Sequence, residues 1–375
     1  MKFIVSSSEL STRLQTLGRV INSKNSIPVL GNFWFHIEGK SLTITAAETE
    51  ITLSTVMTLT EADADADFLL SARTIQDAIK EIPDQPLTFY VNVEQCRVTI
   101  EYQNGKYELT CDKADEFPRT KALEGDIHTV VVASEKLYAG VNRALFATAE
   151  DQLRPQLNGV YFDLTPESLV IVASDGLKLA CGRILNVRDD NAASFILPKK
   201  PANAFKPVLA RDGGDTTVSF TDRNAVFTTE DYTMNCRLIE GRFPNYSSVI
   251  PKDNPNRITV NRPALISALR RVLVMSSLAS TLVKLQIAPN RLTISAQNID
   301  YAMGGEEWII CDYNGMNMSI GFKGATLLEL LGNIESEEVT FCLANDGSRA
   351  GVIVPTQQPE DEDVLMMLMP MMLNE

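Results

Sequence analysis

Residues 129–146 read TVVVASEKLYAGVNRALF and set out the unit from which the whole chain is built. The β-branched run at its start is typical of a strand. Ser134 follows as a helix cap. The apolar residues that come next fall at i, i+4, i+7 and i+8, one face of a 3.6-residue period. They are Leu137, Val141, Ala144 and Leu145.

The same pattern occurs twice more. At the start of the chain Ser6 precedes a helical period and Glu9 completes a capping box. Near residue 258 a third β-branched run leads to Asn261 as the cap. The equivalent leucines, separated by 127 and 128 residues, are Leu10, Leu137 and Leu265. A second strand-and-helix unit follows in each copy, and each copy closes on a proline, with a spacing of 126 residues: Pro118, Pro244 and Pro370.

The repeat predicts an α+β protein of three similar domains, each with two helices and many strands, rather than one large core. Polar linkers place the domains at 1–123, 124–253 and 254–375. The six expected helices, counted with their edges, are 7–24, 71–81, 134–149, 197–211, 261–275 and 321–331.

Composition excludes several classes of protein. The 375 residues are 45% hydrophobic and 22% charged, which is ordinary for a globular protein, and no apolar run reaches the length of a membrane span. The N-terminus turns polar at Ser6, so no signal peptide is expected. The six cysteines lie far apart and form no C-x-x-C pair. Free thiols in a reducing cytoplasm are the expectation.

Motifs for catalysis are missing from the sequence. His36 and His128 have no cysteine or carboxylate at ligand spacing, and no phosphate-binding loop or nucleophile motif is present. The acidic runs 61–67 and 359–363 are read as solvated loops, since 61–67 lacks the glycine and terminal glutamate of a calcium loop. No metal and no cofactor are expected. A hydrolase or transferase that assembles distant carboxylates stays open as the alternative.

Basic residues are distributed unevenly. The six expected helices carry fifteen Lys and Arg against five Asp and Glu, a net charge of +10. Because the whole chain carries −14, everything outside the helices carries −24. A positive helical face on an acidic body would attract a polyanion at one surface. No recognition-helix or aromatic signature accompanies it, so base reading is not expected.

Five motifs in this order give the chain a resemblance to a known family. They are IPVLGN at 27–32, LNGV at 157–160, ASDGLKLA at 173–180, EGRFPNY at 240–246 and LMPM at 368–371. Together with the threefold repeat, these motifs give a resemblance that covers the whole chain. The chain resembles the bacterial replicative sliding clamps, which are the beta subunits of DNA polymerase III. The resemblance implies a non-catalytic processivity protein: a head-to-tail homodimer whose six clamp-type domains form a ring, one chain being half of it. The helices would line the hole around double-stranded DNA, bound without sequence preference.

Residues that match the family's DNA-facing positions are Lys24, Arg73, Arg154, Lys199 and Lys200. Plain surface solvation is the alternative for each of them. A second implied surface is a hydrophobic pocket for short linear motifs of polymerases, clamp loader, mismatch-repair proteins and ligase. Its matching residues are Leu157, Ser174, Gly176, Leu177, Lys178, Leu179, Pro244, Val249, Met369, Pro370, Met371 and Leu373. The apolar C-terminal run could instead simply complete the last strand.

The implied ring joint would bring Tyr107 and Leu109 against Val274 and Met275 of the partner, and intradomain core is the alternative for all four. A trimer of two-domain clamps is a rival architecture, which three repeats per chain disfavour. The sequence also departs from the family pattern: Leu177-Lys178 stands for the usual His-Arg, Met372 replaces a basic residue, and Pro155-Gln156 lacks aromatic residues.

Overall fold

The computed structural model describes residues 1–22, 27–345 and 347–373. The chain divides into two compact units, Met1–Tyr138 with Lys200–Leu238, and Ala139–Lys199 with Ile239–Glu375. The boundary passes through α3 and the first residue of α4, and every sheet lies within one unit. Helix bounds are α1 Ser7–Leu17, α2 Ala72–Ile79, α3 Ser134–Leu145, α4 Lys199–Leu209, α5 Arg262–Leu273 and α6 Gly324–Gly332.

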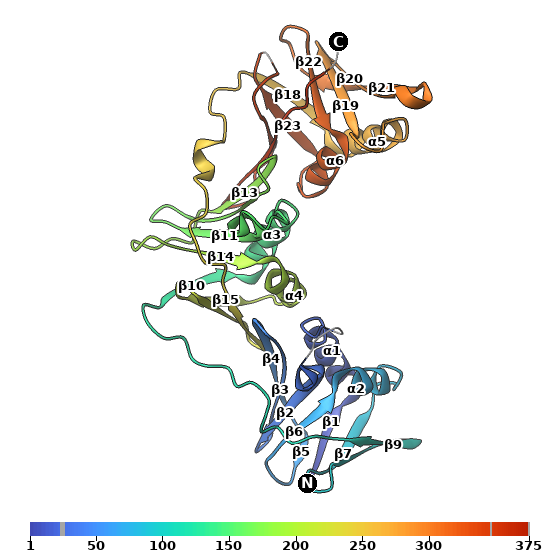
Figure 1. Ribbon diagram of the computed structural model, residues 1–375, viewed down its shortest axis with the longest axis vertical. Helices are drawn as coiled ribbons and strands as arrows, with labels where there is room; N and C mark the ends of the chain where they lie inside the picture. The colour runs from blue at the N-terminus through green and yellow to red at the C-terminus, as the bar shows by residue number, and fades with distance from the viewer. Residues whose placement is uncertain (23–26, 346, 374–375) are drawn as a thin grey trace. The chain divides into compact units, whose positions relative to one another are not determined.

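The first unit contains two antiparallel sheets (Figure 1). One has the strand order β5-β1-β7-β8-β9 and the other β10-β15-β16-β17-β4-β3-β2-β6. The bounds are β1 Lys2–Ser6, β2 Asn32–Glu38, β3 Ser41–Glu48, β4 Ile51–Thr58, β5 Glu61–Ala62, β6 Ala66–Ser71, β7 Pro86–Asn92, β8 Arg97–Tyr102, β9 Gly105–Thr110, β10 His128–Ala133, β15 Asp215–Phe220, β16 Asn224–Thr228 and β17 Tyr232–Arg237.

The second unit is built on a twelve-stranded antiparallel sheet. Its order is β14-β11-β12-β13-β25-β24-β23-β18-β21-β20-β19-β22. The bounds are β11 Gly159–Leu164, β12 Leu169–Ser174, β13 Lys178–Ile184, β14 Ala193–Pro198, β18 Asn256–Asn261, β19 Leu282–Ala288, β20 Arg291–Asn298, β21 Met303–Asp312, β22 Met318–Lys323, β23 Glu338–Leu343, β24 Gly351–Pro355 and β25 Glu362–Leu368.

The threefold repeat is visible in strand order. The ladder β4-β3-β2-β6 recurs as β13-β12-β11-β14 and as β21-β20-β19-β22. The ladder β1-β7-β8-β9 recurs as β10-β15-β16-β17 and as β18-β23-β24-β25. Strand β17 of the second copy pairs with β4 of the first, and β25 of the third copy pairs with β13 of the second. Strands therefore complete sheets across the linkers, while the predicted domain bounds stay a prediction.

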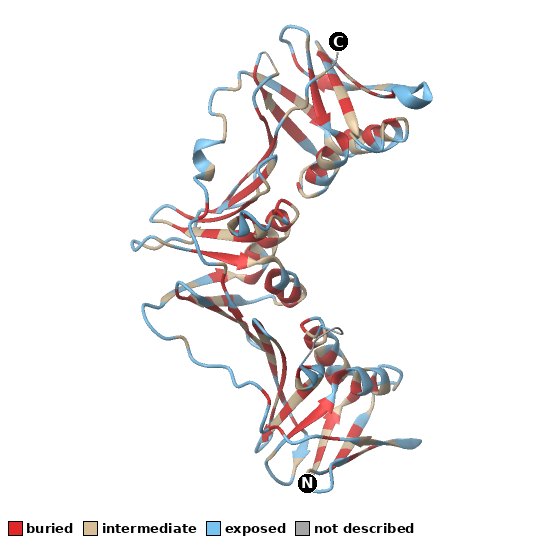
Figure 2. Ribbon diagram, viewed as in Figure 1, coloured by how far each residue is buried: buried red, intermediate tan, exposed pale blue. Residues whose placement is uncertain are grey.

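The six predicted helices are confirmed, each shorter than the segment counted with its edges. Ser6 caps α1 by accepting from the Glu9 backbone N–H, and Asn261 caps α5 in the same way. The second copy differs, because α3 already includes Ser134, whose hydroxyl donates to Asp212. The inward faces of the helices are buried (Figure 2). Leu10 and Leu137, on the predicted apolar faces, are fully inaccessible. Helix packing thus follows the sequence period in all three copies.

The prediction that the two acidic runs are solvated loops holds only in part: the acidic side chains of 61–67 are exposed, but β5 and the start of β6 lie in that run, and Glu362 of the second run is buried in a strand. In 61–67, the Asp67 carboxylate accepts one hydrogen bond from the Trp34 indole N–H at 2.7 Å, and Asp63 accepts one from the Lys2 backbone N–H. In 359–363, Glu362 begins β25, is 8% exposed, and forms a buried ion pair with Arg143 of α3. These carboxylates therefore stabilise local structure through hydrogen bonds and an ion pair.

Candidate functional site

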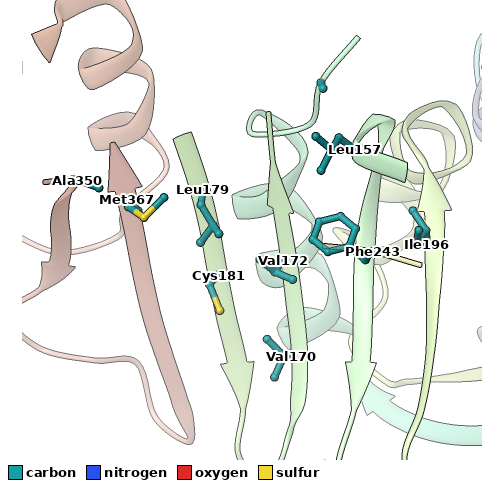
Figure 3. Close-up of a cluster of buried hydrophobic side chains, with 10 residues drawn as sticks. Leu157, Val170, Val172, Leu179, Cys181, Ile196, Phe243, Ala350 and Met367 are labelled. Atoms are coloured by element: carbon teal, nitrogen blue, oxygen red, sulfur yellow. The ribbon is translucent and has the colours of Figure 1, made fainter. Parts of the chain in front are cut away.

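A cluster of buried apolar side chains in the second unit underlies the predicted peptide-binding residues (Figure 3). It draws on η2 (Pro155–Asn158), on β12, β13, β14 and β25, and on Phe243 in the following segment. Of the predicted residues, Leu157 and Leu179 belong to it, at 4% and 0% exposure. We call this buried cluster the floor of the candidate site. Its members are Ala149, Leu157, Val170, Val172, Leu179, Cys181, Ile196, Phe243, Ala350 and Met367.

The turn between β12 and β13 projects one apolar side chain from this floor. The Ser174 hydroxyl donates to the Lys178 carbonyl at 2.8 Å, and the Asp175 carboxylate accepts from the Leu177 N–H at 2.8 Å. Gly176 has φ +92°, a conformation that favours glycine. These bonds fix the turn with Leu177 pointing outward, 65% exposed.

The Lys178 side chain, unlike that of Leu177, is largely buried. Its ammonium lies 3.3 Å from the Glu329 carboxylate of α6 and 5.2 Å from the centre of the Phe146 ring, and its side chain is 13% exposed. A charge held in this way contributes little to the outer surface. The substitution of Leu177-Lys178 for the family's usual pair therefore leaves leucine as the exposed member.

The C-terminal segment is fixed at two points. The Met369 N–H donates to the Leu177 carbonyl at 2.8 Å, and the Met371 N–H donates to the Gly321 carbonyl of β22 at 2.8 Å. A Cβ at Gly321 would lie 2.7 Å from the Met371 oxygen, so only glycine allows this approach. Met369 is 39% exposed and Val249 53% exposed. We call Leu177, Val249, Met369, Pro370 and Met371 the apolar rim.

Aromatic residues outside the predicted set support the segment from Pro244 to Val249. The ring of Phe243 stacks on Tyr161 with centroids 4.6 Å apart, and the Tyr246 hydroxyl donates to Asp163 at 2.8 Å. Burial, followed by the hydrogen bond to Asp163, raises the pKa of Tyr246, which therefore remains a neutral donor. Their only sequence clue was the motif GRFPNY at 241–246. Pro244 itself is exposed.

The predicted DNA-facing residues have acidic neighbours. Lys199 lies 3.0 Å from Glu150, and Lys200 lies 2.8 Å from Glu48. The Arg73 side chain is 93% exposed, with Asp77 4.0 Å away. Because these pairs are at the surface, they are worth little and can be exchanged for other anions. Lys24 lies outside the described residues.

Arg154 has a different setting from the lysines. Its guanidinium forms a 2.8 Å ion pair with Asp151, which lowers the pKa of that carboxyl, chiefly through the hydrogen bond. The same guanidinium lies 3.4 Å from the position that a Cβ would take on Gly176. The structure thus brings Arg154 to the turn beside the apolar rim. Whether it contacts DNA stays a prediction.

The four residues predicted for the ring joint lie within β9 and just after α5. Val274 follows α5 and is 70% exposed, so it is not core. Met275 lies 3.0 Å from the position that a Cβ would take on Gly305 of β21. Tyr107 of β9 packs on Tyr102, with ring centroids 5.2 Å apart, and Leu109 is half-buried on the same strand.

Within residues 1–22, 27–345 and 347–373, no group of His, Cys, Asp or Glu has the arrangement of a metal site. No helix in that part of the chain is both long and apolar enough to cross a membrane. All six cysteines are free thiols.

Three family models match the chain in order. They describe the N-terminal, central and C-terminal domains of the DNA polymerase III beta subunit and match residues 1–121, 131–245 and 247–372. The beta sliding clamp of Pseudomonas aeruginosa is 27% identical, with 100% of both chains covered, and that of Haemophilus influenzae is 26% identical at the same coverage.

Solved structures agree with the family models. Crystal structures of the DNA polymerase III beta subunit from Pseudomonas aeruginosa and from Thermotoga maritima each cover 100% of both chains at 26% identity, with TM-scores of 0.91 and 0.90. A Pseudomonas aeruginosa clamp bound to griselimycin has a TM-score of 0.93 at 26% identity. The predicted α+β clamp fold is confirmed. The chain belongs to the DNA polymerase III beta subunit family, the sliding clamps of the bacterial replicative polymerase, which are non-catalytic processivity factors.

Proposed function

We propose that this chain closes with a second copy into a ring around double-stranded DNA and tethers polymerases and other partners at the apolar rim. The observation that carries the proposal is the strand pairing. Each junction between repeats joins the last strand of one copy to the first ladder of the preceding copy, β17 to β4 and β25 to β13. The equivalent pair for the remaining edges is β9 with β21.

In the described residues, β9 and β21 each have a backbone edge that is not fully paired. In the described residues, β9 pairs only with β8, and Met303–Ile310 of β21 pairs only with β20. Unpaired strand edges are templates for another chain. A β9–β21 pair between two copies is a head-to-tail contact, which forms a closed ring when the rotation per subunit permits. Trp308 and Ile310, 55% and 73% exposed, would be buried in it beside Val274.

Oligomeric state tests this joint. Light scattering of the purified chain should give twice 41.4 kDa at micromolar concentration. Tyr107 and Leu109 are the proposed contacts on β9, with Val274 and Met275 across the joint. A stable monomer in the unaltered chain would contradict the proposal.

Binding of DNA would be topological, with helical cations near the phosphates. Arg73, Lys199 and Lys200 are proposed contacts, together with Lys24 and Arg154. Because Lys199 and Lys200 already have carboxylate partners, each lysine would contact a phosphate only weakly, which suits a ring that slides. The proposal predicts long retention on a closed circle and rapid loss once the circle is cut. Equal retention on circular and linear DNA would show that enclosure is not the mode of binding.

The apolar rim is proposed to take short linear motifs from polymerases, clamp loader, mismatch-repair proteins and ligase. Leu177, Val249 and Met369 give exposed apolar area, and the flexible methionine side chain can adapt to varied partners. Binding of a clamp-motif peptide should be lost in Leu177→Glu. The matched control is Leu185→Glu, an exposed leucine just beyond β13. Equal loss in both variants would place the motif elsewhere.

Free thiols and the DNA partner together support a cytoplasmic location.

A further inference from the structure

The hairpin of β8 and β9 has a cysteine on each side of its open end. The two strands pair with Arg97 opposite Thr110, so the next position outward brings Cys96 opposite Cys111. The Cys111 N–H donates to the Cys96 carbonyl at 3.2 Å, which continues the ladder by one bond. Four cysteines have no cysteine opposite them in any ladder of the described residues: Cys181, Cys236, Cys311 and Cys342.

The spacing at this pair suits a disulfide. Directly opposite residues of an antiparallel pair have Cα atoms about 4.5 to 5.5 Å apart and side chains on the same face. A disulfide joins residues whose Cα atoms are about 4.4 to 6.8 Å apart. Cys96 lies in the turn between β7 and β8, at φ +53°, so the residue that must adjust belongs to a turn rather than to a strand.

The two thiols differ in exposure. Cys96 is exposed, which is true of none of the other five cysteines, whereas Cys111 is 2% exposed. Burial, followed by the charge of the nearby Cys96, raises the pKa of Cys111. The thiolate is the reactive form of cysteine. A reagent in solution therefore meets Cys96 first, while Cys111 stays a protected thiol beside it.

Cys111 lies where a free edge strand joins the body of the first unit. Next to it, Asp112 and Leu69 of β6 exchange two backbone hydrogen bonds, at 2.8 and 3.0 Å. Before it, β9 pairs only with β8 in the described residues and projects from the unit (Figure 1). A bond between Cys96 and Cys111 would fasten the projecting strand at its base.

We propose that Cys96 and Cys111 are a reversible modification site, at which a low-molecular-weight disulfide such as oxidised glutathione links the two thiols. The Cys96 thiolate attacks one sulfur of oxidised glutathione and releases one glutathione thiolate. Cys111 then loses its proton and attacks the Sγ of Cys96, which releases the second glutathione. Two electrons and two protons pass in all from the protein thiols to oxidised glutathione, which becomes two molecules of glutathione.

The bond would restrict β9. It closes the loop 96–111, and closing a loop removes conformations from the opened hairpin. Tyr107 and Leu109 alternate with Cys111 on one face of this strand, so they would be held with it. Disulfides of this kind in the cytoplasm are usually transient and respond to redox state. The disulfide itself does not depend on the proposed ring, but any effect on assembly rests on the proposed joint.

The test uses the full-length reduced chain in degassed buffers of oxidised and reduced glutathione, with iodoacetamide to stop exchange. Mass spectrometry of proteolytic peptides should find a Cys96–Cys111 disulfide whose proportion rises with the share of oxidised glutathione and vanishes with dithiothreitol. Cys111→Ala should stop at a glutathione adduct on Cys96, and Cys96→Ser should stay reduced. The matched control, Cys342→Ser, removes a half-buried thiol of the second unit and should still form the bond.

Hydrogen exchange measures the consequence for the strand. The 105–110 amides should exchange at least roughly tenfold more slowly in the oxidised chain. The same measurements in Trp308→Glu separate this site from the ring, because that variant should be monomeric and should form the disulfide equally well. A Trp308→Glu variant that stays dimeric counts against the joint alone.

Three results would overturn the proposal. They are a folded chain that forms no Cys96–Cys111 bond, a bond that forms only in urea, or other cysteine pairs that form equally well. Mapping in the unaltered chain decides this even if Cys111→Ala does not fold. Unchanged exchange of the 105–110 amides after oxidation would contradict the restriction of β9.

Discussion

The buried ion pair between Arg143 of α3 and Glu362 of β25 offers a measurement of what holds the last strand in place. Each side chain is 7% exposed, and the partners are 219 residues apart. Arg143 also lies close to β13, where its guanidinium is 3.7 Å from the position that a Cβ would take on Gly182. The pair therefore fastens a helix of the second repeat to a strand of the third.

Removing one partner leaves the other charge buried. Glu362→Leu leaves the Arg143 guanidinium buried without its partner, and Arg143→Met does the same to the Glu362 carboxylate. Loss of one member of a buried pair destabilises by about 3–5 kcal/mol, while replacing both members with apolar residues is often neutral or stabilising by about 1–4 kcal/mol. We expect each single variant to be strongly destabilised and the double variant to recover most of the loss.

Hydrogen exchange measures the effect at the strand itself. Because about 1.4 kcal/mol is a factor of ten, the single variants should lose protection of the 362–368 amides by roughly 100- to 4,000-fold. β25 leads directly into Met369, so affinity for a clamp-motif peptide should fall with protection. In the double variant both readouts should return close to the unaltered values.

Two results would refute the reasoning. Loss of less than tenfold protection in both single variants would mean that the pair is solvated or dispensable. If the 362–368 amides of the double variant exchange as fast as those of the single variants, side-chain volume and not charge holds β25 in place.

The remaining predictions concern DNA, assembly and pH. Lys199→Gln with Lys200→Gln should shorten retention on circular DNA and reduce the salt dependence by about one per lost phosphate contact, without change in circular dichroism. Trp308→Glu should put a carboxylate into the proposed joint and give monomers in light scattering at micromolar concentration. Burial raises the pKa of Cys181 and Cys236 from 9.0 to about 12. Unfolded thiols therefore ionise first, and the free energy of unfolding by urea should fall as pH rises from about 9 to 12.

Matched changes sharpen these tests. Lys113→Gln with Arg188→Gln removes the same charge at exposed positions outside the helices and should leave retention unaltered. Trp308→Phe should keep the dimer. Cys181→Ala with Cys236→Ala should flatten the alkaline fall, and an unchanged slope would assign it to other groups.

Much of the architecture could be predicted because it is local and periodic. Helix faces such as that of Leu137 follow from spacing, and caps such as Ser6 and Asn261 follow from side-chain chemistry within three residues. Copying the pattern three times made each prediction stronger. Strand pairing across linkers, as in β17 with β4, joins residues far apart in sequence and needed the structure.

Charge was harder to predict, because a charged residue's role depends on distant partners. The net charge of +10 on the expected helices includes cations that are not free surface charges. Arg13 pairs with Asp231 at 2.9 Å, and Arg143 is buried. The acidic neighbours of Glu362 predict a solvated side chain, because nothing near it in sequence indicates its partner Arg143, 219 residues away. The peptide-binding positions came from family motifs, and the structure added the packing around Tyr246.

The pairings β17–β4 and β25–β13 are held within one covalent chain, and this sets them apart from the proposed β9–β21 pairing. Tethering gives the internal pairs an effective concentration in the millimolar range for short flexible linkers, so dilution does not separate them. The pairing between chains has no tether and follows mass action. As protein concentration falls, opening should occur at that seam first, with each half otherwise intact.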